Sequence, residues 1–182
     1  GITNSNQDQT RDNAFVMMKN VQIYGGFDPD NGIDDLTDTR IFGANGSVLS
    51  GNIGDEMQSN DNTYHIVVSS NEVGNALLDG FYLTGAYSTS SDNASYISLN
   101  NSLVQKSRGA FACAHSSPTI TNCFFDNNSV GLGGAGISNS FQSSPIITNC
   151  TFSSNYSAFR GGAIYNTDNS YPTITNCSFN NN

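Results

Sequence analysis

Basic residues are scarce in this chain of 182 residues, which has 6 Lys and Arg against 15 Asp and Glu. The net charge of −9 argues against binding to nucleic acid or to anionic membrane surfaces, because both need clusters of basic side chains. It also disfavours a polyanionic substrate such as pectate, unless calcium intervenes. No run of 18 apolar residues is present, so we expect no direct membrane insertion of this segment, and no signal peptide is visible.

Helical repeat patterns are lacking as well. Leucine-rich, ankyrin and TPR repeats need stretches rich in Leu, Ala, Glu and Lys, whereas Asn, Ser and Thr are abundant here and only 12% of the residues are charged. Apolar residues come in short bursts, such as VQIYGGF at 21–27 and HIVV at 65–68, separated by Asn, Gly and Ser. These patterns predict many short strands joined by turns.

What the sequence does contain is an internal repeat. TITNC stands at 119–123 and again at 173–177, with IITNC between them at 146–150, so the three cysteines follow at a constant step of 27 residues. A fixed period of this size predicts a solenoid, in which each repeat buries its apolar face against its neighbours. With strands as short as these, a parallel β-helix is the expected solenoid.

Weaker copies of the motif begin at Met18, Leu49 and Leu78. Together the copies predict about six coils in a single β-helix domain over 1–182, with the most regular repeats at 116–182. The longest step contains residues 86–108, which we predict to form an inserted loop. The chain stops one strand into a repeat with no cap, so we expect it to be a fragment of a longer protein.

The motif also predicts which side chains face the core. Its third position is Asn or Gly, the residues that tolerate the left-handed backbone needed at a corner between two strands. Alternation then places the Ile, the Cys and the Phe of each copy inward. Equivalent residues stack in such a fold, which predicts an asparagine ladder of Asn122, Asn149 and Asn176 and an aromatic ladder of Phe125, Phe152 and Phe179.

The four cysteines allow three interpretations: disulfides, a metal site, or core packing. Stacked coils give Cys123, Cys150 and Cys177 parallel side-chain directions, which make the torsion of a disulfide hard to reach. No CxxC pair is present, and His65 and His115 stand at unrelated positions. We therefore interpret the column as small buried hydrophobes rather than as nucleophiles, with Cys113 buried in the preceding strand.

A family resemblance enters at the segments FDNN, FSSN and FNNN with the following GGAGI and GGAIY. Their pairing resembles the repeat of the chlamydial polymorphic outer membrane proteins and is similar, more broadly, to the pectate-lyase-like superfamily. The segments VQIYGGF, VLSGNIG and LLDGFYLTGA resemble the opening coils of large secreted β-helix proteins of Bacteroidetes. The resemblance implies an all-β, right-handed parallel β-helix from a secreted or cell-surface bacterial protein. The repeat motifs are architectural and imply no catalytic residue.

The candidate binding residues are the threonines of the repeated strands, which alternation places outward. They form a flat Thr-x-Thr array of the kind that ice-binding β-helices present, although ordinary β-propensity also explains it. Exposed aromatic residues offer a second kind of surface, suited to sugar chains or to a protein. The candidates are Thr119, Thr121, Thr148, Thr173 and Thr175, with the aromatic residues Phe141, Tyr156, Tyr165 and Tyr171.

The candidate metal site is the acidic segment FDPDNGIDDLTD, since carboxylates close together suit a hard cation. Asp28, Asp30, Asp34 and Asp35 are its candidate Ca²⁺ ligands, although a solvated turn explains the segment equally. No other cofactor is expected.

For function, we expect a non-catalytic adhesive or structural module that binds polysaccharide or protein on a host or neighbouring cell. The alternative is a polysaccharide lyase or glycoside hydrolase with its site beside residues 86–108, and ice binding is a minor alternative. No catalytic residue is assigned, because the sequence shows no convergence of the basic residues and no repeated carboxylate pair. The basic residues concerned are Arg40, His65, Lys106, Arg108 and Arg160.

Overall fold

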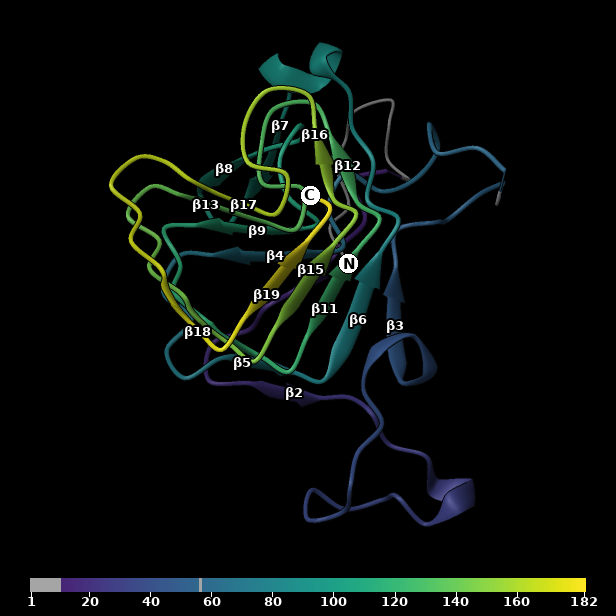
Figure 1. The fold of residues 1–182 in the computed structure, drawn as a ribbon. Coiled ribbons are helices and arrows are strands. Elements are labelled where there is room, and N and C mark those ends of the chain that lie inside the picture. Colours follow the sequence, from purple (N-terminus) through teal and green to yellow (C-terminus); the bar gives the residue numbers. More distant parts are fainter. Residues whose placement is uncertain (1–10, 56) are drawn as a thin grey trace.

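The computed structural model describes residues 11–55 and 57–182, so the first ten residues of the predicted domain and Glu56 lie outside the described residues. It confirms the all-β prediction: three parallel sheets of five strands each enclose one core (Figure 1). Sheet A consists of β1 (Phe15–Val16), β4 (Val67–Ser70), β9 (Phe111–Ala114), β13 (Ile137–Ser140) and β17 (Ile164–Asn166). Sheet B consists of β2 (Gln22–Tyr24), β5 (Leu77–Asp79), β10 (Thr119–Thr121), β14 (Ile146–Thr148) and β18 (Thr173–Thr175). Sheet C consists of β3 (Ser47–Ser50), β6 (Phe81–Thr84), β11 (Phe124–Asp126), β15 (Thr151–Ser153) and β19 (Ser178–Asn180).

Each coil contributes one strand to each sheet, so the described residues form five coils rather than the predicted six. The error lies in the first coil. There Ile23 aligns with Leu78 of the second coil, and Leu49 aligns with Leu83. The copies that begin at Met18 and Leu49 therefore belong to one coil, which residues 25–46 interrupt between β2 and β3.

The corners between sheets B and C have the predicted backbone. Gly80, Asn122, Asn149 and Asn176 all have positive φ, between 52° and 84°. Asparagine occupies three of these corners because its short polar side chain tolerates the left-handed region better than larger residues do.

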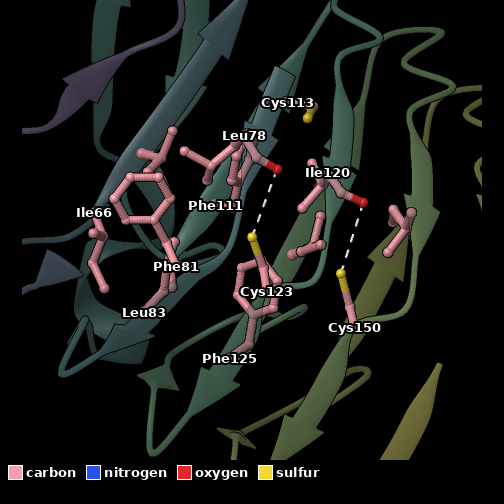
Figure 2. Packing of buried hydrophobic residues seen from close by; sticks show 14 of the residues in the cluster. Ile66, Leu78, Phe81, Leu83, Phe111, Cys113, Ile120, Cys123, Phe125 and Cys150 are labelled. Carbon is pink, nitrogen blue, oxygen red and sulfur yellow. Dashed lines mark hydrogen bonds between the residues drawn. The ribbon is translucent and has the colours of Figure 1, made fainter. Parts of the chain in front are cut away.

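The core follows the predicted alternation. Ile120, Cys123 and Phe125 are fully buried, and Figure 2 shows them inside the coil with residues from sheet A such as Phe111. The phenylalanine ladder is confirmed: the ring centroids of Phe125 and Phe152 lie 4.9 Å apart and nearly parallel, and those of Phe152 and Phe179 lie 5.0 Å apart.

The cysteines are free thiols in this core. The Sγ atoms of Cys123 and Cys150 lie 3.7 Å from the carbonyl oxygens of Leu78 and Ile120 in the preceding coils (Figure 2). Burial raises the pKa of the Cys113 thiol, and the neighbouring Cys123 together with burial raises that of Cys150. Both thiols are therefore held in the protonated form, in which a thiol is a poor nucleophile.

The principal asparagine ladder is a different column from the one predicted. At the predicted corner, Asn149 donates to Asn122 at 3.4 Å, and Asn122 donates to Asp79. The buried ladder runs instead through the last residue of each F-x-x-N segment, where Nδ2 of Asn128 donates to Asn155 and Nδ2 of Asn155 donates to Asn182. Nδ2 of Asn155 also donates to the carbonyl of Phe125, so one amide side chain bonds to both neighbouring coils.

Replacing Asn155 with alanine is expected to lower the free energy of unfolding by about 2 kcal/mol, because buried partners on Phe125 and Asn128 lose their hydrogen bonds. Urea denaturation followed by circular dichroism measures the change. The exposed Asn75 is the matched control, and Asn75→Ala is expected to change stability little. Equal losses in the two variants would contradict the role of the ladder.

Two segments between the coils are prominent. Residues 25–46 contain the short 3₁₀ turns η1 (Pro29–Asn31) and η2 (Gly43–Asn45) and project beyond the coils (Figure 1). The insertion predicted near 86–108 contains η3 (Ser90–Ala94) and an antiparallel hairpin of β7 (Tyr96–Leu99) and β8 (Ser102–Gln105). The hairpin packs Ile97 and Val104 onto outward residues of sheet A such as Val68 and Ala112. A two-stranded sheet of β12 (Ser129–Val130) and β16 (Tyr156–Ser157) completes the described strands. None of the described helices is long and apolar enough to cross a membrane.

Candidate functional site

The five candidate threonines lie together on the outward face of sheet B. Parallel pairing aligns Thr119, Ile146 and Thr173 in one column and Thr121, Thr148 and Thr175 in the next. We call these six residues the threonine face. Its middle strand is hydrogen-bonded on both sides, so the backbone under the threonines is held by neighbours above and below.

The threonine face is uncharged and presents hydroxyl groups beside methyl groups. Thr173 and Thr175 are exposed, whereas Thr119, Thr121 and Thr148 are half-buried. Ile146 interrupts the first column with an exposed apolar side chain. Such a surface can donate and accept hydrogen bonds at regular spacing along the coil axis, about 4.8 Å per coil.

On the two preceding coils the threonine face gives way to an ion pair. Asp79 and Tyr24 continue the column of Thr121, and Nη2 of Arg40 lies 2.8 Å from the carboxylate of Asp79. Nη1 of Arg40 donates to the carbonyl of Gly25, and Asn122 donates to the other oxygen of Asp79. The Asp79 carboxylate is thereby committed to anchoring residues 25–46 rather than free for acid–base chemistry.

Three of the four predicted aromatic residues, Phe141, Tyr156 and Tyr165, lie outside sheet B. Tyr165 belongs to β17 of sheet A, and Phe141 directly follows β13, so neither lies on the threonine face. The ring of Phe141 stacks on His115 at 4.8 Å between centroids. Tyr171 precedes β18 and is exposed, while Tyr156 is exposed in β16.

The acidic segment forms local turns. The carboxylate of Asp38 accepts hydrogen bonds from the backbone N–H groups of Asp34 and Asp35. The carboxylate of Asp35 accepts from the backbone N–H and from the hydroxyl of Thr37. The bond from the Thr37 backbone is the main cause that lowers the pKa of Asp35. Within residues 11–55 and 57–182 no three His, Cys, Asp or Glu side chains are grouped as metal ligands. Calcium binding through Asp28, Asp30, Asp34 and Asp35 stays a prediction.

Groups that catalysis could use are engaged in the structure. Lys106 lies beside the hairpin but is buried, with its Nζ 2.7 Å from the carboxylate of Asp12. Asp126 accepts hydrogen bonds from Tyr82 and Ser153, and burial, with help from Asp126, raises the pKa of Tyr82 to about 12. A hollow of about 530 Å³ beside β1 is lined by Phe15, Met18, Ile53 and neighbouring residues, and none of the described residues that line it is titratable.

The sequence predicted that the basic residues would not converge, and for one pair this prediction is wrong. Arg40 and Lys106 each form an ion pair with a different carboxylate. Arg108 and Arg160, however, converge on the ring of Tyr165. Sequence reasoning missed this convergence because only the stacking of the coils brings the two arginines together.

Comparison with known proteins places the fold. The family model for the right-handed beta helix region matches residues 60–182, which is most of the chain. No curated protein and no solved structure matches it.

Proposed function

The chain belongs to the right-handed β-helix family, and on that basis we propose that it is a non-catalytic, secreted or cell-surface module of a bacterium. Its role is adhesive or structural, and the threonine face is its contact surface. The observation that supports the proposal is the in-register stacking of five threonines on one rigid, uncharged sheet face. The engagement of Asp79, Asp126 and Lys106 in structural contacts favours binding over catalysis.

The partner that suits this face is a neutral polysaccharide on a neighbouring cell. Threonine hydroxyls hydrogen-bond with sugar hydroxyls, and the methyl groups pack against the apolar face of a sugar ring. A net charge of −9 disfavours a chain that carries many negative charges.

The test replaces Thr148 and Thr175 with arginine, which places two long side chains on the threonine face. Binding to a panel of neutral cell-wall polysaccharides, measured by surface plasmon resonance, is expected to weaken about tenfold or more. The matched control places arginine at Thr151 and Ser178 instead. These two residues lie in the same two coils but in sheet C. The control variant is expected to bind as the parent protein does.

The same polysaccharides, incubated with the protein with and without a chelator, decide between binding and catalysis. Binding without release of reducing ends or unsaturated sugars supports the module. Turnover would establish the enzymatic alternative, and retained binding in the threonine-face variant would reject this surface. A thermal-hysteresis measurement tests ice binding on the same samples.

A further inference from the structure

A second surface lies on the outward side of sheet A, beside the β7–β8 hairpin. The hairpin covers the apolar part of that side, formed by Val68, Ala112 and Ala114. Where the hairpin ends, a cleft of about 200 Å³ remains over the next coils. The hairpin contributes Tyr96 and Leu103 to its lining, the coils contribute Ser140 and Phe141, and Arg108 and Asp168 also line it.

Arg108, the arginine in this cleft, is one of three arginines without an ion pair to a carboxylate among the described residues, the others being Arg11 and Arg160. Lys19 pairs with Glu72, Arg40 with Asp79 and Lys106 with Asp12, whereas Arg11 donates to the carbonyls of Asn62 and Tyr87 and Arg160 donates to the hydroxyl of Tyr165. Arg108 and Arg160 form no ion pair within the described part of the chain. Nε of Arg108 is in addition buried without a hydrogen-bond partner.

The fold holds these two arginines in one column. Arg108 pairs with Gly133 of the next coil, and Gly133 pairs with Arg160 of the coil after it. Glycine is required between them because a Cβ atom on Gly133 would lie 2.7 Å from the carbonyl oxygen of Arg160 and 3.1 Å from the ring of Tyr165. The guanidinium carbons of Arg108 and Arg160 lie 5.4 and 5.6 Å from the centre of the Tyr165 ring.

The column therefore carries a surplus of positive charge. Burial lowers the pKa of the Arg108 guanidinium, and the nearby charge of Arg160 acts in the same direction. At Tyr165, burial acts to raise the pKa of the hydroxyl. Hydrogen bonds from Thr167 and Arg160 act the other way, and the pKa is lowered overall. Among the described residues that line the cleft, Arg108 is the one cation and Asp168 the one carboxylate, and Arg160 adds a second positive charge in the adjoining column.

We propose that this cleft binds a sugar residue bearing a single carboxylate, such as a uronic acid at the end of an otherwise neutral chain. Arg108 pairs with the carboxylate, because a guanidinium binds the two oxygens of a carboxylate with matched geometry. Tyr96 and Phe141 supply exposed aromatic walls for the ring, and Ser140 and Gln105 supply polar groups for its hydroxyls.

The chemistry of the surroundings favours this ligand over two others. A protein of net charge −9 repels a polyanionic chain much more strongly than it repels a ligand with one terminal carboxylate. An acidic peptide satisfies the arginine but makes poor use of a short cleft with aromatic walls, which suits the apolar face of a single ring. The site is separate from the threonine face and does not depend on the function proposed for it.

The test is a titration of the ¹⁵N-labelled protein with methyl β-glucuronide, followed by NMR at low salt. The amide signal of Gly133 is expected to shift on binding. Methyl β-glucoside, acetate and a peptide rich in glutamate are titrated in parallel. Binding of the glucuronide at least about tenfold tighter than that of the glucoside is expected, since a charge-assisted hydrogen bond to the guanidinium is stronger than a bond between neutral groups.

Two variants with opposite expected effects keep the test independent of folding. Arg108→Gln is expected to weaken glucuronide binding about tenfold, and Asp168→Asn is expected to strengthen it by removing the competing carboxylate. Lys19→Gln is the control, because Lys19 is an exposed cation paired with Glu72 elsewhere on the surface. Its binding should equal that of the parent protein.

Several outcomes would overturn the proposal. Acetate that binds as tightly as the glucuronide would show that the walls do not recognise a sugar. A peptide that binds more tightly would assign the cleft to a protein partner. Absence of binding to the parent protein, or weaker binding in Asp168→Asn, would reject the site.

Discussion

Replacing Phe152 with alanine is expected to lower the free energy of unfolding by about 4 kcal/mol. Phe152 is fully buried, and its ring stacks between Phe125 and Phe179, so truncation removes contacts with two coils at once. Loss of a buried phenylalanine costs about 3–5 kcal/mol through lost transfer free energy and the cavity left behind, and stacked aromatic pairs add about 0.5–1.5 kcal/mol. Urea denaturation monitored by circular dichroism measures the change.

The same repeat supplies the control for this experiment. Phe159 is 65% exposed, so Phe159→Ala removes an aromatic ring of the same size from the surface. Its free energy of unfolding is expected to change by less than about 0.5 kcal/mol. A loss at Phe152 no larger than the loss at Phe159 would contradict the aromatic ladder as a source of stability.

Acidification from pH 6.5 to pH 4 is expected to destabilise the protein by about 3 kcal/mol through His65 alone. Burial is the main cause that lowers the pKa of His65 from 6.5 to about 4. Nδ1 lies 2.7 Å from the carbonyl of Gly109, and Nε2 is buried without a hydrogen-bond partner. Asp12 favours the charged ring, and Lys106 opposes it.

The direction of this effect follows from proton linkage. Between pH 6.5 and pH 4 the unfolded chain protonates His65 while the folded protein keeps it neutral, so stability is lost as the pH falls through this range. At 1.36 kcal/mol per pKa unit the difference amounts to about 3 kcal/mol.

Unfolding by urea at a series of pH values measures the effect. His65→Asn is expected to remove this part of the pH dependence, because asparagine has no proton to gain. The control is His115→Asn, at an exposed position with a left-handed backbone that asparagine tolerates. An unchanged pH dependence in His65→Asn would show that other groups cause the acid sensitivity.

The regular part of the fold could be read from the sequence because each coil repeats the environment of the last. Phe125, Phe152 and Phe179 recur at one step and stack as expected. The first coil could not be read in the same way, since residues 25–46 separate Ile23 from Leu49 and divide one motif into two apparent copies.

The charged contacts leave still less signal in the sequence. Asp12 and Lys106 meet only because the hairpin packs against the residues around β1. Arg108, Gly133 and Arg160 share a column, but the steps between them differ, from 108 to 133 and from 133 to 160, so the period does not reveal it. A pair held by tertiary stacking between unlike residues has no local pattern that marks it.

The corner between sheets B and C is a place where the chain can accept insertions. In the second coil the chain crosses that corner with Gly80 alone, whereas in the first coil residues 25–46 lie between the same two sheets. The entropy of closing a flexible loop grows only with the logarithm of its length, about 0.6 kcal/mol for each doubling. Lengthening a corner therefore costs little. Inserting or deleting one residue within a strand, in contrast, moves every later side chain of that strand to the wrong face. New loops can be added to this scaffold at its corners without altering the cross-section that the coils share.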